Sequence, residues 1–309
     1  MYYLVYGFLY LLSILPMWAL YRLSDAIAFL LNHVFKYRYD VVLSNLKIAF
    51  PEKTDQERLA IARQFYKNFV DNFIETIKLI SASDKFIQER FQFDQNVFKP
   101  RETSGEKLQL HLGHNFNWEM ANVAVPFQTT IPWLVAYMPI KNKAIEKLFL
   151  KIRTRTGGVM LPATDMKNAM IPYRNRQYAL ALVADQVPGN VKRAHWMNFF
   201  GKPTPFVTGP EAGARLANMS VVFAQIYKTK RGFYRVSFTE QSKPIHEMEK
   251  GELTRTYVKF LEKTLKADPS MWLWSHRRWK HEWKDEYAKQ WIDTAPVPGS
   301  ENYELRINN

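Results

Sequence analysis

The first twenty residues are almost uniformly apolar. Residues 2–20 read YYLVYGFLYLLSILPMWAL and contain no charged side chain. Roughly 20 apolar residues are enough to cross the hydrocarbon core of a bilayer, and lipid-embedded helices tolerate the kink that Pro16 would introduce. The pattern therefore predicts a membrane anchor over residues 1–22. It is expected either to span the bilayer or to lie in the interface, with its tyrosines and Trp18 at head-group level; a buried helix is the plainer alternative.

Helical periodicity continues to about residue 100. A second apolar helical run covers residues 24–36, and residues 40–50 lead into a longer helical stretch in which Thr54 is an expected N-cap and Glu57 its capping-box partner. Apolar residues then recur at helical spacing at Leu59, Ile61, Ala62, Phe65, Phe69, Phe73 and Ile77. We therefore expect a helical region over residues 23–100.

From residue 101 the pattern alternates between short strands and helices. Apolar runs rich in strand-forming residues lie at 108–112, 132–137, 178–184 and 220–227. Helical stretches lie at 116–125, 142–155, 164–174 and 209–218, and a late amphipathic helix covers 252–267. This alternation predicts an α/β fold with a mixed, largely buried sheet flanked by helices. Since no break in composition marks a second domain, residues 23–295 are expected to form one domain, helical to residue 100 and α/β from 101 to 295, followed by a loose tail at 296–309.

Composition narrows the chemistry. The chain has no cysteine, which excludes disulfides, thiolate catalysis and cysteine-ligated metals. Its seven histidines do not form an H-E-x-x-H pattern, so no metal site is expected. The net charge of +14 attracts polyanions, which include nucleic acids, anionic lipid head groups and acidic proteins. The apolar N-terminus and the lack of a localised Lys/Arg stripe favour a membrane over a nucleic acid.

The stretch HLGHNFNWEM, residues 111–120, holds the candidate chemistry. It leaves the strand at 106–112 for a helix, and polar residues at the ends of such strands face the ligand crevice. His111 lies within the strand pattern and is expected to pack or to shape the pocket. His114 in the turn and Glu119 in the first helical turn can meet. A carboxylate on one imidazole nitrogen would support the other nitrogen as a general base for a hydroxyl; a satisfied structural histidine is the alternative.

These residues also carry a resemblance. H-x4-D/E after a strand is the hallmark of the glycerolipid acyltransferase superfamily, and HNFNWE resembles the H-F-G-N-W-E box of the bacterial late acyltransferases of lipid A biosynthesis, the lauroyl and myristoyl transferases. Other blocks resemble that family in the same order along the chain: SNLKIAFPEKTDQER, KIRTRTGG, VADQVPG, FFGKPTPFVTGPEAGARLA and MWLWSHRRWK. Together they cover almost the whole chain. One departure is Asn115-Phe116, where the family usually has Phe-Gly, directly beside the expected base.

The resemblance implies a membrane-bound O-acyltransferase that needs no cofactor. It would move a fatty acyl chain from acyl carrier protein or acyl-CoA to a hydroxyl of a lipid A precursor, and either acidic donor would suit the charge of +14. The enzyme would lie at the inner (cytoplasmic) membrane with its catalytic domain on the cytoplasmic face. The positive-inside rule agrees, because basic residues follow the anchor at Arg22, Lys36, Arg38 and Lys47. Open alternatives are another membrane glycolipid or an aminolipid as acceptor, and a basic membrane-surface binding protein without catalysis.

The family blocks also suggest a role for individual residues. His114 would be the base, Glu119 its orienter and Arg153 the first candidate to stabilise the oxyanion, with Arg155 second. Candidates to bind the acyl chain or the acceptor are Asn117, Arg155, Asp185, Gln186, Phe200, Gly201, Thr208, Arg277, Arg278 and Lys280. Each has a structural alternative: a solvated helix face, a turn after the strand at 178–184, a core position, a helix N-cap, a surface patch, or arginines that hold a carboxylate within the fold.

Overall fold

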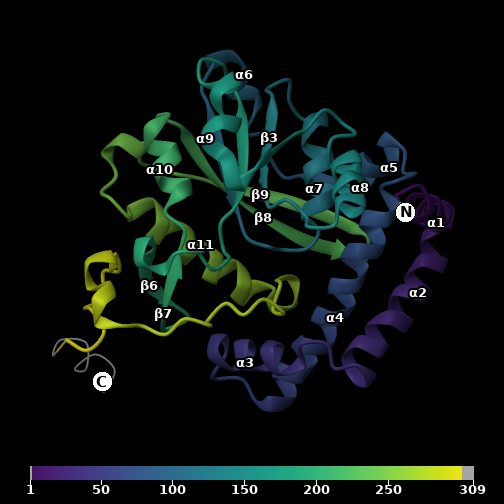
Figure 1. The fold of residues 1–309 in the computed structure, drawn as a ribbon, viewed down its shortest axis with the longest axis horizontal. Coiled ribbons are helices and arrows are strands. Elements are labelled where there is room, and N and C mark those ends of the chain that lie inside the picture. The colour runs from purple at the N-terminus through teal and green to yellow at the C-terminus, as the bar shows by residue number, and fades with distance from the viewer. Residues whose placement is uncertain (1, 301–309) are drawn as a thin grey trace.

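The computed structural model describes residues 2–300, and its N-terminal region is helical (Figure 1). α1 (Tyr2–Ile14) and α2 (Met17–Phe29) are separated at Pro16, which lacks the backbone N–H of a continuous helix. The chain bends by 115° there, and α2 runs on into a π-helical turn, Leu30–Val34. Residue 22, the expected end of the anchor, lies inside α2. Between residues 2 and 300 no single helix has the length and apolarity of a membrane span, and only this bent pair, taken together, passes that test.

α3 (Tyr39–Ala49) and α4 (Asp55–Lys78) complete the first helical layer, with α2 and α4 side by side (Figure 1). The capping box is confirmed, since Thr54 Oγ1 accepts from the Glu57 backbone N–H and the Glu57 carboxylate accepts from Thr54 N–H. The buried face of α4 differs from the expected one: Phe73 is 44% exposed, whereas Asp71 and Glu75 are buried. α4 contacts α1, α2, α3 and α7, so its polar side faces protein rather than water.

A seven-stranded sheet in the order β1-β9-β8-β2-β5-β3-β4 forms the centre of the α/β part. Its strands are β1 (Phe91–Phe93), β2 (Leu108–Leu112), β3 (Trp133–Tyr137), β4 (Val159–Pro162), β5 (Ala179–Val183), β8 (Ser220–Lys230) and β9 (Phe233–Glu240). All neighbouring pairs are parallel except β8 and β9. Every residue of the central β2 is buried. The expected mixed, largely buried sheet is confirmed.

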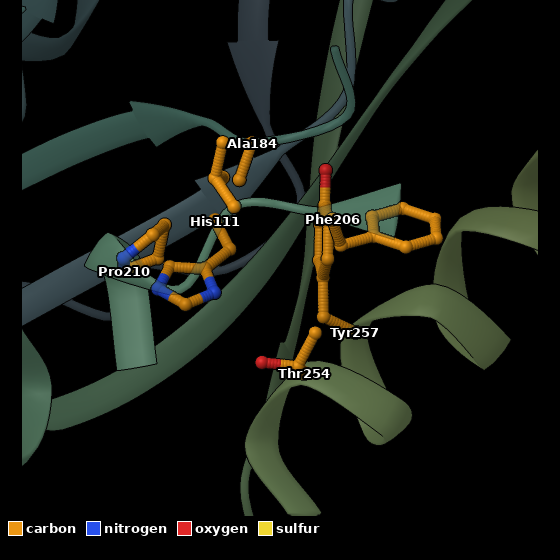
Figure 2. A pocket seen from close by; sticks show the side chains of 7 residues that line it. His111, Ala184, Phe206, Pro210, Thr254 and Tyr257 are labelled. Atoms are coloured by element: carbon orange, nitrogen blue, oxygen red, sulfur yellow. The ribbon is translucent and has the colours of Figure 1, made fainter. Parts of the chain in front are cut away.

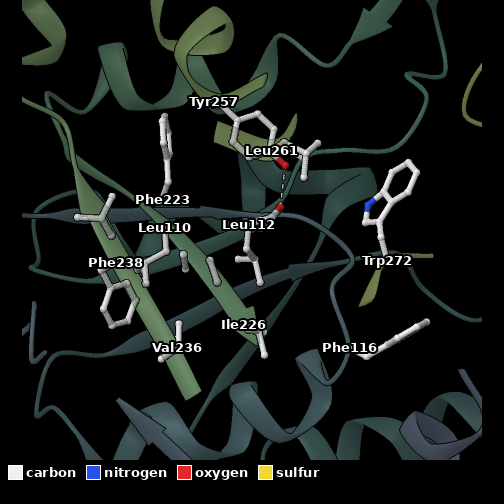
Figure 3. Packing of buried hydrophobic residues seen from close by; sticks show 14 of the residues in the cluster. Leu110, Leu112, Phe116, Phe223, Ile226, Val236, Phe238, Tyr257, Leu261 and Trp272 are labelled. Carbon is white, nitrogen blue, oxygen red and sulfur yellow. Dashed lines mark hydrogen bonds between the residues drawn. The ribbon is translucent and has the colours of Figure 1, made fainter. Parts of the chain in front are cut away.

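Helices flank this sheet: α5 (Asp84–Arg90), α6 (Lys99–Ser104), α7 (Trp118–Ala124), α8 (Lys143–Arg153), α9 (Met166–Ala169), α10 (Gly209–Leu216) and α11 (Glu252–Ala267) (Figure 1). The core lies where α11 covers β2 and β8. Tyr257 and Leu261 of α11 pack over the sheet beside Phe223, and Tyr257 Oη donates a 2.8 Å hydrogen bond to the carbonyl of Leu112 (Figure 3). α11 therefore rests directly on the carboxyl end of β2.

Several elements differ from the sequence-based expectation. The helix expected over 164–174 is shortened to α9 with single 3₁₀ turns on both sides, because Pro172 cannot continue a helix. β1, β4 and β9 were not foreseen, nor was a separate antiparallel hairpin of β6 (His195–Phe199) and β7 (Lys202–Phe206). Of the tail expected to be loose, residues 297–300 form a hydrogen-bonded turn, and 301–309 lie outside the described residues.

Candidate functional site

The register of two parallel strands brings His114 and Asp185 together. β2 pairs with β5 so that Leu112 lies opposite Val183. When that register is continued two residues past the strand ends, His114 comes to lie opposite Asp185. His114 Nδ1 is 2.5 Å from Asp185 Oδ1, and the backbone N–H of His114 donates to Asp185 Oδ2 at 2.7 Å. One carboxylate therefore fixes both the ring and the main chain of the histidine.

The surroundings of Asp185 determine which nitrogen of His114 is free. Burial alone would raise the pKa of Asp185, but the His114 imidazole, the His114 N–H and the Trp272 indole, which donates at 2.5 Å, lower it to about 2. The ionised carboxylate only accepts, so Nδ1 carries the proton and Nε2 keeps its lone pair. The amide nitrogen of Gln186 donates to Nε2 at 3.0 Å, and the imidazole is 20% exposed. Nε2 is thus the nitrogen available to a substrate hydroxyl, which would take the place of the Gln186 amide.

The expected pairing of His114 with Glu119 was wrong. Glu119 instead makes a two-pronged ion pair with Arg153, with Oε2 2.9 Å from Nε and Oε1 2.5 Å from Nη2, and Trp118 Nε1 donates to its Oε1 at 3.2 Å. Glu119 lies in the first turn of α7 and Arg153 is the last residue of α8, which contacts α7. Asp185 already holds Nδ1 of His114. The site therefore contains two pairs, His114 with Asp185 and Arg153 with Glu119. The centre of the Trp118 ring, whose N–H bonds to Glu119, lies 5.4 Å from the centre of the His114 ring.

Contacts with the segment after α11 fix the turn that carries His114. Asn115 forms a β-bridge with Trp272, and the Phe116 N–H donates to the carbonyl of Met271 at 3.1 Å. Gly113, which has no Cβ, allows Leu261 and Asp185 to lie close to this turn. A Cβ at that position would lie 2.7 Å from Leu261 Cδ1 and 3.2 Å from Asp185 Oδ2. The turn is held on every side by protein.

Asn117 and Arg155 contact protein groups rather than open space. Asn117 is fully buried; its Oδ1 accepts from the Met120 N–H and caps α7, while its Nδ2 donates to Glu75. Arg155 donates to the carbonyls of Leu79 and Ala82, the unpaired acceptors that follow α4, and its Nη2 bond to Ala82 is 2.7 Å. These contacts favour the structural alternative for both residues.

Phe200 and Gly201 form the turn between β6 and β7. Both have the left-handed backbone that such a turn requires, with φ of 52° and 71°. The Phe200 ring packs edge-on against Phe50 at 5.6 Å, and the Phe200 N–H donates to Glu262. Thr208 directly precedes α10, so the expected helix start is confirmed, but its hydroxyl makes no capping bond.

The basic cluster expected at 277–280 is not one surface patch. Arg277 and Lys280 are exposed, whereas Arg278 is fully buried, with its guanidinium 4.2 Å from the centre of the Phe206 ring. Its Nη2 donates to the Pro205 carbonyl at 2.9 Å, and burial lowers the pKa of Arg278 to about 10. The buried Arg278 is therefore separated from the surface on which Arg277 and Lys280 lie.

His111 packs in the core beside a small cavity. Its ring stacks on Phe223 and meets Tyr257 edge-on, and burial lowers its pKa to about 3, so the imidazole is neutral. The cavity, about 10 Å³, has room for one water molecule and is also lined by Thr254 and Phe206 (Figure 2). A larger polar cavity of about 500 Å³ lies at the start of β8, away from His114. Among residues 2–300, no three acidic or histidine side chains converge on a possible metal position.

Comparison with known proteins identifies the family. A sequence model described as bacterial lipid A biosynthesis acyltransferase matches residues 1–281. The lipid A biosynthesis lauroyltransferase of Escherichia coli strain K12 is 25% identical over 279 residues, which is 89% of each chain. Among solved structures, the 1-acyl-sn-glycerophosphate acyltransferase of Thermotoga maritima superposes with a TM-score of 0.38 at 11% identity, over 82% of this chain and 99% of that one. Since the family model matches nearly the whole chain, this protein belongs to the bacterial lipid A biosynthesis acyltransferases.

Proposed function

We propose that this acyltransferase moves a fatty acyl chain from a thioester to a hydroxyl of a lipid A precursor, with His114 as general base. The observation that carries the proposal is the His114–Asp185 pair at the carboxyl ends of β2 and β5. Asp185 holds Nδ1 at 2.5 Å, and the imidazole is 20% exposed. Family membership supports a lipid A acceptor, and the pair supplies a base of the kind that activates hydroxyls.

The proposed reaction needs one proton acceptor, which His114 supplies. Nε2 of His114 takes the proton as the acceptor oxygen attacks the thioester carbonyl, and a C–O bond forms. Asp185 stabilises the imidazolium through the Nδ1 bond. When the tetrahedral intermediate collapses, the C–S bond breaks and the leaving thiolate takes the proton back from Nε2. Gln186, which bonds to Nε2 in the free protein, would have to release it to the acceptor hydroxyl.

Arg153 remains the candidate for stabilising the oxyanion. Its Nε and Nη2 are occupied by Glu119, whereas Nη1 has no hydrogen-bond partner within residues 2–300. The fork of a guanidinium bound in this way has a fixed orientation. We therefore reassign Glu119 from orienter of the base to positioning residue of Arg153.

The donor and the membrane contact are supported by charge and by exposed apolar area. The net charge of +14 favours an acidic donor, and we propose acyl carrier protein with acyl-CoA as the alternative.

One face of α1 and the start of α2, here named the apolar face, is 55–80% exposed and consists of Tyr3, Leu4, Phe8, Leu11, Ile14 and Trp18. Lys147 and Lys151 of α8 lie over the Tyr2 and Tyr6 rings beside it. An apolar face with a basic rim suits an anionic leaflet. We propose that it sits in the inner membrane, with the catalytic domain on the cytoplasmic face.

Mass spectrometry of the lipid products tests the proposal. The purified protein in detergent would be given acyl carrier protein thioesters or acyl-CoA together with a tetra-acylated lipid A precursor. We expect a product heavier by one acyl chain, formed by wild type and by the surface control His246→Ala but not by His114→Ala. Unchanged transfer by His114→Ala would refute the mechanism. Thioester consumption without acylated precursor would point to another glycolipid or aminolipid as acceptor, and no consumption at all would favour a non-catalytic membrane-binding protein.

A further inference from the structure

Glu75 is an acid buried at the junction of three elements. It lies on α4, is 1% exposed, and accepts three hydrogen bonds from side chains that are distant in sequence. Tyr21 Oη of α2 donates to Oε1 at 2.9 Å, while Asn117 Nδ2 and Tyr234 Oη of β9 donate to Oε2 at 2.8 Å each. No lysine or arginine within residues 2–300 forms an ion pair with Glu75. A buried carboxyl costs free energy unless it is well bonded, so its position in the fold requires an explanation.

One of these bonds reaches the catalytic turn. Asn117 follows His114 by three residues and directly precedes α7, which it caps through the 3.1 Å bond from the Met120 N–H. Since Asn117 is fully buried, Glu75 fixes which way its amide points. Oδ1 must then face the helix. The start of α7, and with it Glu119 beside Arg153, is therefore placed by a carboxylate on α4.

A second bond reaches the helix that carries part of the apolar face. Tyr21 lies one helical turn after Trp18 on α2. Its hydroxyl meets the same carboxylate that holds Asn117, so only one residue separates α2 from the catalytic turn. α2 has other polar contacts with α4, among them the 2.7 Å bond from Ser24 Oγ to Asp71. The other partners of Asp71, Lys228 and Arg231, form no bond to Asn117 within residues 2–300.

We propose that Glu75 is a positioning residue for acyl transfer, which connects the seat of α2 to the geometry of the turn between His114 and α7. This inference rests on the proposed function, because it assigns a role in the same site. Glu75 touches neither reactant. Its carboxylate holds Asn117, the start of α7 and the Glu119–Arg153 pair in place, and the Tyr21 bond makes that placement depend on how α2 is seated at the membrane.

Glu75→Leu removes both acceptor oxygens and keeps a side chain of similar size. The Asn117 Nδ2, which can only donate, then loses its acceptor, as do the Tyr21 and Tyr234 hydroxyls. Misplacing a catalytic group by about 1 Å can cost about a hundredfold in rate. With anionic vesicles holding the lipid A precursor, we expect Glu75→Leu to lower kcat about tenfold or more, while KM for the thioester and the vesicle-bound fraction of protein stay within twofold.

Two milder variants guard against a simple loss of folding. Tyr21→Phe removes one hydroxyl and keeps the ring, and it should lower kcat several-fold. Ser24→Ala, the matched control on the same helix, should stay within twofold. In the Glu75→Leu background Tyr21→Phe should add nothing, because both changes act through one carboxylate. Additive effects of these two changes would contradict the connection.

Hydrogen exchange gives a readout that does not depend on turnover. In Glu75→Leu the amides of residues 118–124 should exchange at least tenfold faster than in wild type, whereas those of α11 keep their protection. Ser24→Ala should leave both segments unchanged. Normal kcat and normal exchange in Glu75→Leu, beside an inactive His114→Ala, would overturn this inference and leave the proposed function standing. Full activity in His114→Ala would refute the proposed mechanism, and the exchange of residues 118–124 would still decide the role of Glu75.

Discussion

Asp185→Asn is the sharpest test of how the base is supported. The carboxylate accepts three N–H groups: His114 Nδ1 at Oδ1, and the His114 backbone and the Trp272 indole at Oδ2. An amide NH2 placed at Oδ2 would face two donors, and leaving buried N–H groups without an acceptor costs about 1–3 kcal/mol each. The NH2 should therefore turn toward Nδ1, where it forces the imidazole to accept. The proton of His114 then moves to Nε2, and the base is lost.

The expected effects on rate and stability can both be sized. Loss of a positioned general base with a wrong tautomer lowers kcat by roughly 10²- to 10⁴-fold. The pKa of Asp185 falls from 3.8 to about 2 in the folded protein; a difference of that size corresponds to about 2 kcal/mol of stability. Because the folded pKa is the lower one, this contribution is present above about pH 4 and is lost as the pH falls toward 2. The stability gap between wild type and Asp185→Asn should narrow over that range.

Two measurements check these expectations. Single-turnover acyl transfer at neutral pH reports the rate of the chemical step, with Glu119→Gln run beside Asp185→Asn, and urea unfolding in detergent between pH 7 and pH 2 reports stability. A rate for Asp185→Asn within threefold of wild type would refute the reasoning. Glu119→Gln should also slow transfer, through Arg153; a near-wild-type rate for Asp185→Asn beside an inactive Glu119→Gln would assign Glu119, and not Asp185, to the base.

Other predictions follow from the same contacts. Glu119→Gln leaves the partly buried Arg153 without its carboxylate, so urea unfolding should show a loss of about 1–3 kcal/mol, and Arg153→Lys should lower kcat with little change in KM because a lysine lacks the guanidinium fork. Gly113→Ala places a Cβ 2.7 Å from Leu261 Cδ1; it should cost about 1–3 kcal/mol in unfolding experiments, part of which Leu261→Ala should restore. The pKa of His111 is lowered by burial to about 3, so wild type should lose stability as the pH falls from 6.5 toward 3, and His111→Leu should flatten that part of the curve.

Elements with a clear periodicity of apolar residues were predictable from the sequence, and elements without one were not. α11 has the bounds that its amphipathic pattern predicts, residues 252–267, because one face of it packs on the sheet and the other meets water. β7 contains Pro203 and Pro205, which argue against a strand inside a large sheet; it forms because it belongs to a separate two-stranded hairpin. β9 alternates buried and less buried residues along FYRVSFTE and could have been recognised from that period.

Buried polar residues were the main failure for the helices. α4 looks like a surface helix with an apolar stripe through Phe65, Phe69 and Phe73, and that interpretation assigns Asp71 and Glu75 to solvent. In the fold, α1, α2, α3 and α7 surround α4, so these acids meet donors supplied by distant segments. The sequence holds one sign of this arrangement, because Asp71 and Glu75 are four residues apart and so lie on the same face of the helix. Sequence alone does not show that this face is covered.

The site shows why local spacing identified the right residues and the wrong pairs. H-x4-E is a local pattern, and both of its residues lie in the candidate site. The partner of His114 lies 71 residues away, because β2 and β5 are parallel neighbours and their ends meet at the same edge of the sheet. Each strand was recognised, but which strands are adjacent is set by crossovers that leave no periodic trace in the sequence. Once β5 is placed beside β2, the register alone selects Asp185 for the histidine. Glu119 is then left free to hold Arg153, so that one acid holds the histidine and the other holds the arginine.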